Sequence, residues 1–315
     1  MKSKFVILFS IIFILTGCSK KDTADYYLSV ITKPISEITD ETGMSEGNDK
    51  ISVYCYDFKT KKLKKIIDLD KENFREPIYS KKDNSIYYTK AFEDDFDLFS
   101  LNLDTKETQQ LTEGMKICSE IIPGEDEIYF TSYTDNEYEG ANYFKGAKPC
   151  VYSKSTGKAS MYFTDSDLSC KDMSYDPYND HLYAGCISPE NSLSEENIDY
   201  IYDFYKDYES PKQLIKSDKG KGVYLVSTMP GSEKLYLWLN DGNNSAPYLY
   251  YLNYEVYKDI DYFAEPVFLN ENEILTDSLS GDPASIDTCN IKTKKRNTLF
   301  TIEGQELVSF KLLSR

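Results

Sequence analysis

The sequence predicts an all-β protein built from a repeated four-stranded unit, and three observations favour this fold class. Tyr and Phe, which suit half-buried pleated strands, number 28 and 16 among the 315 residues. Two short hairpin patterns recur along the chain. No stretch after residue 24 keeps the apolar spacing of a helix.

The first hairpin pattern is an alternating strand, a polar turn that contains lysine, and a second short strand. Its copies are VYCYDFKTKKLKKI, LFSLNLDTKETQQL, CVYSKSTGKASMYF, DYIYDFYKDYESPKQL, YLYYLNYEVYKDIDYF and IDTCNIKTKKRNTLF. A polar residue precedes each turn, at intervals of 37 to 51 residues. These residues are Asp57, Asn102, Ser153, Asp203, Asn253 and Asn290.

The second hairpin pattern alternates with the first along the chain. A strand meets a turn rich in Pro, Gly or Asn, and a strand that opens with Ile or Leu follows. Its copies are IYSKKDNSIYYTK, EIIPGEDEIYFTS, SYDPYNDHLYAG, STMPGSEKLYLW and VFLNENEILTD. Together the two patterns give four short strands per unit, and units of 40 to 50 residues are typical of β-propeller blades.

The turns of the second pattern carry a family resemblance. MPGSEKLYL and IPGEDEIYF resemble the Pro-Asp-Gly turn and apolar strand of the TolB-like six-bladed propellers. This resemblance covers residues 26–315 and implies an all-β, six-bladed β-propeller. A seven-bladed ring and two stacked sheets remain as alternatives.

The pattern also predicts how the ring closes. The first unit lacks its innermost strand, while the chain ends with the unpaired segment ELVSFKLLSR. We therefore expect Leu307–Leu313 to pair beside Tyr26–Thr32, which would protect both strand edges. The expected blades are 26–70 with 306–315, 71–114, 115–167, 168–220, 221–263 and 264–305.

The N-terminus has the features of an export signal. Lys2 and Lys4 precede the apolar stretch Phe5–Leu15, whose helical length of about 16 Å is too short to span a membrane. The segment LTGC resembles the lipobox of bacterial lipoproteins. It implies a signal peptide at 1–17, an acylated Cys18 and a short tether at 18–25, with the protein held on the outer side of the cell membrane by its lipid, palmitate being the expected kind of acyl chain. A buried core cysteine is the alternative.

Six cysteines remain after Cys18, an even number that permits disulfides outside the cytosol. Cys170 and Cys186 lie at matching positions of a hairpin centred near Tyr178, so they are the candidate disulfide. The alternative is that all six are buried free thiols. No CxxC pair is present, so the sequence predicts neither a zinc site nor a dithiol redox motif.

Loop lengths indicate which face of the propeller binds a partner. The loops between the second and third strands of the blades vary most and are acidic, whereas the turns between the third and fourth strands are rich in lysine. We expect the lysine-rich turns to lie near anionic lipid or simply in solvent. The candidate binding residues of the acidic loops are Glu37, Asp40, Glu41, Asp135, Glu137, Tyr138, Tyr143, Glu195 and Glu196.

Composition limits the possible functions. A net charge of −17 argues against nucleic-acid binding. His181 is the only histidine and no GxSxG segment occurs, which disfavours a catalytic triad or a histidine-rich metal centre. A Ca²⁺ site near TDNEYEG stays possible. We therefore expect a non-catalytic binding or scaffolding propeller without cofactor, whose partner is a protein, peptide or envelope glycan. A carboxylate-based glycan lyase or hydrolase, and a sensor or accessory subunit of an envelope complex, are the alternatives.

Overall fold

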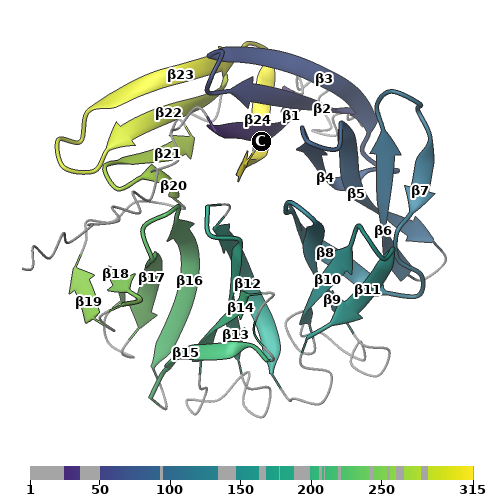
Figure 1. The fold of residues 1–315 in the computed structure, drawn as a ribbon. Coiled ribbons are helices and arrows are strands. Elements are labelled where there is room, and N and C mark those ends of the chain that lie inside the picture. Colours follow the sequence, from purple (N-terminus) through teal and green to yellow (C-terminus); the bar gives the residue numbers. More distant parts are fainter. Residues whose placement is uncertain are drawn as a thin grey trace, which may run out of the picture.

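The computed structural model describes residues 25–35, 50–92, 95–133, 147–162, 168–176, 178–187, 199–205, 208, 210–218, 221–240, 245–253, 256–259, 266–277 and 283–314. These residues form six antiparallel sheets of four strands each, arranged in a ring (Figure 1). No α-helix occurs within these ranges. The predicted all-β, six-bladed β-propeller is confirmed.

The strands of each blade follow one another from the centre of the ring outward. Blade 1 contains β24 (Gln305–Ser314), β1 (Tyr26–Pro34), β2 (Lys50–Asp57) and β3 (Lys62–Asp70). Blade 2 contains β4 (Arg75–Ser80), β5 (Ser85–Phe92), β6 (Asp95–Asn102) and β7 (Thr108–Gln110). Blade 3 contains β8 (Lys116–Pro123), β9 (Glu127–Tyr133), β10 (Lys148–Ser153) and β11 (Lys158–Met161).

The other three blades follow the same order. Blade 4 contains β12 (Ser169–Asp176), β13 (His181–Ile187), β14 (Asp199–Tyr205) and β15 (Lys212–Lys216). Blade 5 contains β16 (Gly222–Met229), β17 (Lys234–Asn240), β18 (Ser245–Tyr251) and β19 (Val256–Asp259). Blade 6 contains β20 (Val267–Asn270), β21 (Glu273–Asp277), β22 (Ala284–Asn290) and β23 (Arg296–Ile302).

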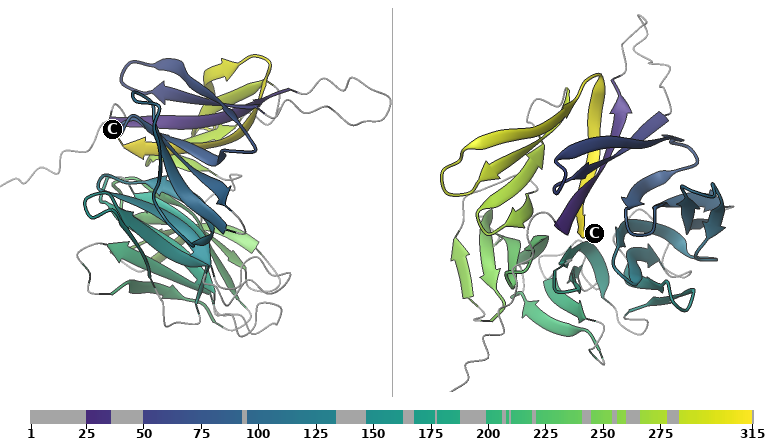
Figure 2. Two further views of the ribbon diagram at one scale, coloured as in Figure 1. Left: turned by 90° about the vertical axis from the view of Figure 1, so that its right-hand side faces the viewer. Right: turned by 45° about the horizontal axis from the view of Figure 1, so that its top comes forward.

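The ring closes through blade 1, as the sequence predicted. The last strand, β24, pairs antiparallel with β1, from Tyr26 opposite Ser314 to Pro34 opposite Gln305 (Figure 2). A bulge between Ile31 and Thr32 leaves Val308 without a partner in this register. Both ends of the ring therefore lie on one face, which we call the turn face because it also carries the short hairpin turns. The opposite face is the loop face.

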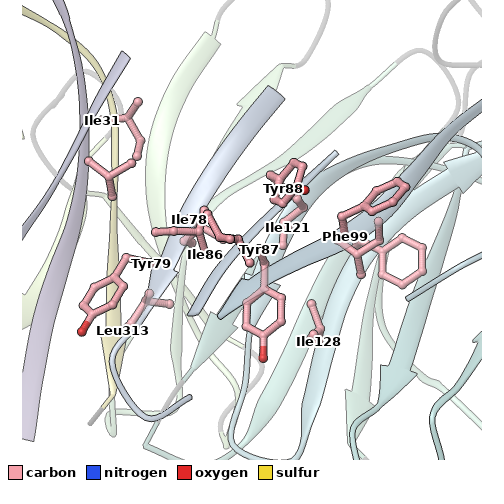
Figure 3. Packing of buried hydrophobic residues seen from close by; sticks show 14 of the residues in the cluster. Ile31, Ile78, Tyr79, Ile86, Tyr87, Tyr88, Phe99, Ile121, Ile128 and Leu313 are labelled. Carbon is pink, nitrogen blue, oxygen red and sulfur yellow. The ribbon is translucent and has the colours of Figure 1, made fainter. Parts of the chain in front are cut away.

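Apolar side chains pack between neighbouring blades. The largest buried cluster joins blades 1, 2 and 3 through residues such as Ile78, Ile86, Ile121 and Leu313 (Figure 3). Burying one such aliphatic side chain contributes about 1.5–3 kcal/mol. Successive side chains along a strand point to opposite faces of the sheet, so each blade packs one set of side chains against the blade before it and the other set against the blade after it.

Tyrosine adds a polar contact to this packing, which accounts for part of its abundance. Tyr27 of β1 is 2% exposed. Its hydroxyl donates to the backbone oxygen of Tyr79 at 3.1 Å and accepts from the backbone N–H of Lys81 at 2.9 Å. The ring is therefore buried while its hydroxyl joins blade 1 to blade 2.

Buried charged groups hold the chain where it crosses from one blade to the next. Asp97 of β6 accepts the backbone N–H of Met115, just before β8. Lys148 of β10 donates from Nζ to the backbone oxygen of Leu168, before β12. Asp199 of β14 accepts the N–H of Val223 in β16. These three residues are at most 2% exposed and recur in the third strands of successive blades, a regularity that was not predicted from the sequence.

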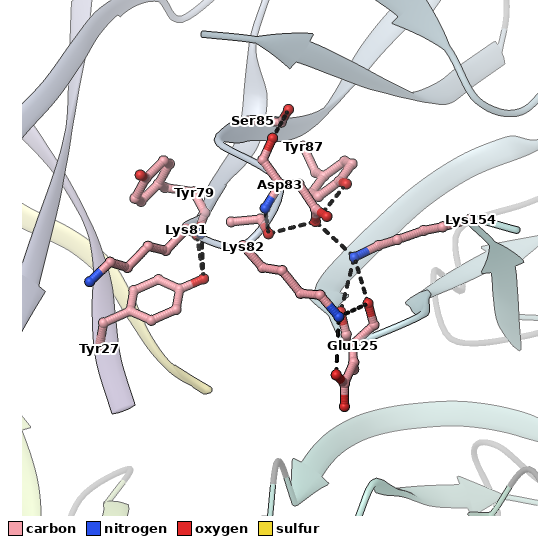
Figure 4. A network of polar contacts seen from close by, with 11 residues as sticks. Tyr27, Tyr79, Lys81, Lys82, Asp83, Ser85, Tyr87, Glu125 and Lys154 are labelled. Carbon is pink, nitrogen blue, oxygen red and sulfur yellow. Dashed lines mark hydrogen bonds and ion pairs between the residues drawn. The ribbon is translucent and has the colours of Figure 1, made fainter. Parts of the chain in front are cut away.

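Ion pairs join adjacent blades on the turn face (Figure 4). Lys154 Nζ lies 2.7 Å from Asp83 Oδ2, and Lys82 Nζ lies 3.1 Å from Glu125 Oε1. The Tyr87 hydroxyl also donates to Asp83, at 2.9 Å. Lys154 belongs to the lysine-rich turns expected near lipid, but its charge is already used between blades 2 and 3.

Ring closure gives a stability prediction. Deleting residues 306–315 should lower the melting temperature by about 10 °C or more, because it removes a whole inner strand and leaves the edge of β1 unpaired. Thermal unfolding followed by far-UV circular dichroism measures this. The control, Val308→Ser, changes a side chain that is 52% exposed and should shift the melt by no more than about 2 °C. A deletion variant with the wild-type melt would contradict the closure.

Candidate functional site

The structure has two hollows, one at the centre of the ring and one between blades 1 and 2. The first, the central channel, has a volume of about 610 Å³ and is lined by the inner strands β8, β12, β16, β20 and β24. The second, the side pocket, has a volume of about 620 Å³ and lies between blades 1 and 2. The two hollows share the lining residues Glu120, Val308, Ser309 and Lys311. The side pocket and the channel thus meet at one charged position.

Three charged residues from three inner strands converge there, and we call them the charged triad: Glu76 of β4, Glu120 of β8 and Lys311 of β24. The backbone N–H of Glu120 donates to Glu76 Oε2 at 3.0 Å. Lys311 Nζ donates to the backbone oxygen of Ile121 at 3.0 Å and lies 3.7 Å from Glu120 Oε2. All three side chains line the side pocket.

Both glutamates lie at irregularities in their strands. Glu76 has φ 47° and Glu120 has φ 55°, in the left-handed region that non-glycine residues rarely adopt. Each falls within a shift of register, between β4 and β5 and between β8 and β9 respectively. A bulge re-aims a side chain relative to regular alternation. Two such irregularities on adjacent inner strands bring the glutamates to the same hollow, at a cost of about 1 kcal/mol each.

The surroundings of the charged triad shift two pKa values. Enclosure by protein raises the pKa of Glu76, and the neighbouring Glu120 carboxylate acts in the same direction, while the hydrogen bond from the Glu120 N–H opposes them. Enclosure lowers the pKa of Lys311, against the attraction of both glutamates. Solvent still reaches these groups through the hollows, since Glu76 is exposed and the side chains of Lys311 and Glu120 are 35% and 53% exposed. Both shifts therefore disfavour the charged forms of groups that a ligand can reach.

The walls of the side pocket are mostly apolar. They include Ile31, Ile51, Phe74, Pro77 and Val308. Val308 is one of the few large apolar side chains that are exposed among the described residues. An apolar pocket with a few convergent polar groups is the usual form of a small-molecule site.

The side pocket lies toward the loop face. Its lining includes Ile31 near the end of β1, Ile51 at the start of β2, and Lys71 and Glu72 between β3 and β4. The predicted acidic loops leave the blades on this same face. The candidate residues Glu37, Asp40, Glu41, Asp135, Glu137, Tyr138, Tyr143, Glu195 and Glu196 lie outside the described residues, as do Cys18 and the segment TDNEYEG. These sites stay predictions. The charged triad was not among the sites predicted from the sequence, because its members carry no local motif.

Cys170 and Cys186 are direct partners across the β12–β13 hairpin, as their positions in the sequence suggested. Both are buried free thiols in this structure, as is Cys289, and Cys55 and Cys150 are buried as well. Cβ atoms directly opposite each other on antiparallel strands are about 4.5–5.5 Å apart, and a disulfide requires about 3.5–4.5 Å, so a bond here would need the two strands to move slightly closer. Their disulfide stays a prediction.

A buried carboxyl group lies beside this cysteine pair. Asp172 follows the bulge at Lys171 in β12 and lies opposite Gly185, and its Oδ1 is buried without a hydrogen-bond partner in the described part of the chain. Gly185 makes room for it, because a Cβ there would lie 2.1 Å from Asp172 Oδ1. Burial raises the pKa of Asp172 to about 7. The adjacent Lys171 only partly opposes this shift, since its Nζ lies 2.8 Å from Asp199 Oδ1.

Asp172 gives a pH-dependent prediction. Between pH 4 and 7 the folded state keeps a proton on Asp172 that the unfolded state releases, so this group makes the protein less stable as the pH rises. Asp172→Asn should therefore stabilise the protein by about 4 kcal/mol more at pH 8 than at pH 4. Urea unfolding across this range measures the difference. Asp104→Asn, in an exposed turn, should unfold like wild type throughout, and a constant difference between wild type and Asp172→Asn would contradict the assignment.

His181 has a structural environment on the turn face. Its Nδ1 lies 2.8 Å from Asp203 Oδ1, and its ring stacks on Tyr205 with 4.3 Å between centroids. It begins β13 on the turn face, opposite the side of the ring that carries the side pocket. The ranges that the structure describes contain no group of three His, Cys, Asp or Glu residues placed to hold a metal ion. They also contain no helix that is both long and apolar enough to cross a membrane.

Comparisons with known proteins agree with the fold. No protein-family model and no curated protein matches the sequence. Among solved structures, TolB from Acinetobacter baumannii has a TM-score of 0.57 and 12% identity over 93% of this chain and 68% of that chain. Hydrazine synthase from Kuenenia stuttgartiensis has a TM-score of 0.59 and 10% identity over 92% of this chain and 47% of that chain.

A third similar structure is a puromycin-hydrolyzing peptidase from Mycobacterium tuberculosis. Its TM-score is 0.51 with 11% identity, over 82% of this chain and 46% of that chain. The chain thus spans less than half the length of this peptidase and of the hydrazine synthase. At these identities the likeness shows the fold alone: a six-bladed, TolB-like β-propeller.

Proposed function

We propose that this chain is a lipid-anchored, extracytoplasmic binding propeller without catalytic activity. The observation that carries the proposal is the side pocket, whose apolar walls end at the charged triad. Its binding face is the loop face, and the partner is a molecule of the cell envelope or its surroundings.

The positions of the chain ends support this orientation. Tyr26, which follows the expected tether, lies on the turn face opposite Ser314. The side pocket is lined by Ser29 and Ile31 of β1, which lie about 10 Å and about 17 Å along the strand from Tyr26 at the rise of a strand. A lipid on Cys18 would therefore hold the turn face near the membrane and leave the side pocket directed away from it. The lipobox-like LTGC segment and the acidic composition are consistent with export.

The proposal is tested by photo-crosslinking of the full-length chain in cells. A photoreactive residue at Val308, in the side pocket, should give specific adducts by mass spectrometry, because this side chain faces the hollow. The matched position is Lys59, an exposed residue of the turn face, which should not give the same adducts. Adducts shared equally by both positions, or none at Val308, would contradict the proposed site.

Cys18→Ser should release the protein from the membrane fraction, and retention there would refute the anchor.

A glycan lyase or hydrolase is a second candidate, because the charged triad places two carboxyl groups in one hollow. Hydrolases of this kind use one carboxyl group as acid and a second as base or nucleophile. Enclosure raises the pKa of Glu76, as such an acid requires. The Lys311 ammonium beside Glu120 instead holds that carboxylate in an ion pair, which favours a binding role over acid–base catalysis.

Product analysis distinguishes the two candidates. Envelope oligosaccharides incubated with the wild-type protein should give no new reducing ends and no unsaturated sugars above the level of a Glu76→Gln, Glu120→Gln double variant. Product formation that depends on both glutamates would establish the enzyme and overturn the non-catalytic proposal.

The accessory-subunit alternative has less support among the described residues. It requires a continuous apolar patch on one rim. The exposed large apolar residues of the described ranges are Tyr208 of blade 4, Tyr224 of blade 5 and Val308 of blade 1. They lie apart, and Val308 faces a hollow rather than a rim.

A further inference from the structure

We propose that the side pocket binds a small amphipathic amine, with the apolar body against the walls and the primary ammonium beside Glu76. This inference rests on the proposed binding function and adds the chemical class of the ligand. It follows from the apolar walls of the pocket and from the hydrogen bonds and ion pairs that the charged side chains around it already form.

The apolar walls of the side pocket favour a ligand with an apolar body. Ile31 and Ile51 from blade 1 face Phe74, Pro77 and Ile78 from blade 2 across the pocket. The volume of about 620 Å³ is in the range of small-molecule sites. An aliphatic chain or an aromatic ring can displace water from these walls at a gain of about 25 cal/mol per Å² of apolar surface removed from water.

The cations around the pocket are already engaged. Arg75 stacks its guanidinium over the ring of Phe96, 4.6 Å from the centroid. Lys311 donates to the backbone oxygen of Ile121 and lies 3.7 Å from Glu120. At the rim, Lys71 and Glu72 are both exposed and carry opposite charges. An anionic ligand would thus find the one ammonium of the charged triad, Lys311, already paired with Glu120.

The carboxyl groups are in excess at this inner end. Glu76 accepts one backbone hydrogen bond, from Glu120, and forms no ion pair with a lysine or arginine of the described ranges. The charged triad holds two carboxylates and one ammonium, so it carries a net charge of about −1 when all three are ionised. A ligand ammonium beside Glu76 would balance this charge. A ligand carboxylate would instead approach two like charges.

The raised pKa of Glu76 is consistent with this charge balance. Enclosure disfavours the carboxylate, Lys311 opposes this effect only in part, and a bound ammonium would oppose it further. Amine binding should therefore weaken as the pH falls and Glu76 takes up a proton. The other titratable or charged groups that line the pocket are Lys71, Glu72, Arg75, Glu120 and Lys311.

The test compares three probes of equal chain length: hexylamine, hexanol and hexanoate. Binding to the full-length protein in detergent is followed by the NMR shifts of the Ile31 and Ile51 methyl groups, because both residues line the side pocket and neither lines the central channel. We expect hexylamine to bind at least tenfold more tightly than hexanol, and hexanoate to bind most weakly.

Matched variants show which side chain causes the preference for hexylamine over hexanol. Glu76→Gln keeps an acceptor for the Glu120 N–H but removes the charge, so it should abolish the preference for hexylamine over hexanol. Glu72→Gln makes the same charge change at the exposed rim and should leave the preference within twofold. Lys311→Met removes the competing ammonium and should strengthen hexylamine binding severalfold.

The outcomes separate this inference from the proposed function. If hexanol or hexanoate binds as tightly as hexylamine at these methyl groups, the ligand class is wrong while the pocket remains a binding site. If Glu76→Gln retains the preference, the role of Glu76 is refuted. If none of the three probes shifts either methyl group, the pocket does not bind apolar ligands and both proposals fail.

Discussion

The pairing of β24 with β1 is the constraint on which the rest of the structure depends. Each four-stranded sheet has two faces, and a ring covers both only when its last blade meets its first. The two paired strands come from opposite ends of the chain, so their contact closes a loop that includes every other blade. The entropy of loop closure grows slowly with length, so one ten-residue strand with buried Leu313 can offset it.

The charged triad is a consequence of this closure. Lys311 reaches Glu76 and Glu120 only because β24 takes the innermost position of blade 1, next to the inner strands of blades 2 and 3. The side pocket likewise needs Val308 and Ser309 of β24 as one of its walls. A single strand therefore completes both the fold and the hollow that we assign to ligand binding.

The two faces of the ring have different electrostatic roles. On the turn face, lysines and carboxylates of adjacent blades neutralise each other, as Lys154 and Asp83 do, and this contributes to holding the blades in register. In the charged triad, two carboxylates share one ammonium. Charge pairing thus stabilises the ring where the chain ends meet, while the unbalanced charge lies in a hollow directed to the opposite face.

The sequence alone determined the strands, the six blades and the closing role of the last segment. Those features depend on local rules, namely period-two alternation and turn residues, which repeat about every 50 residues and reinforce one another. It also placed Cys170 opposite Cys186, because a hairpin fixes the register of its own strands. The triad was decided only by the tertiary structure: Glu76 and Glu120 are 44 residues apart and share no motif. Their inward position depends on bulges that partner strands impose, and Lys311 joins them only through ring closure.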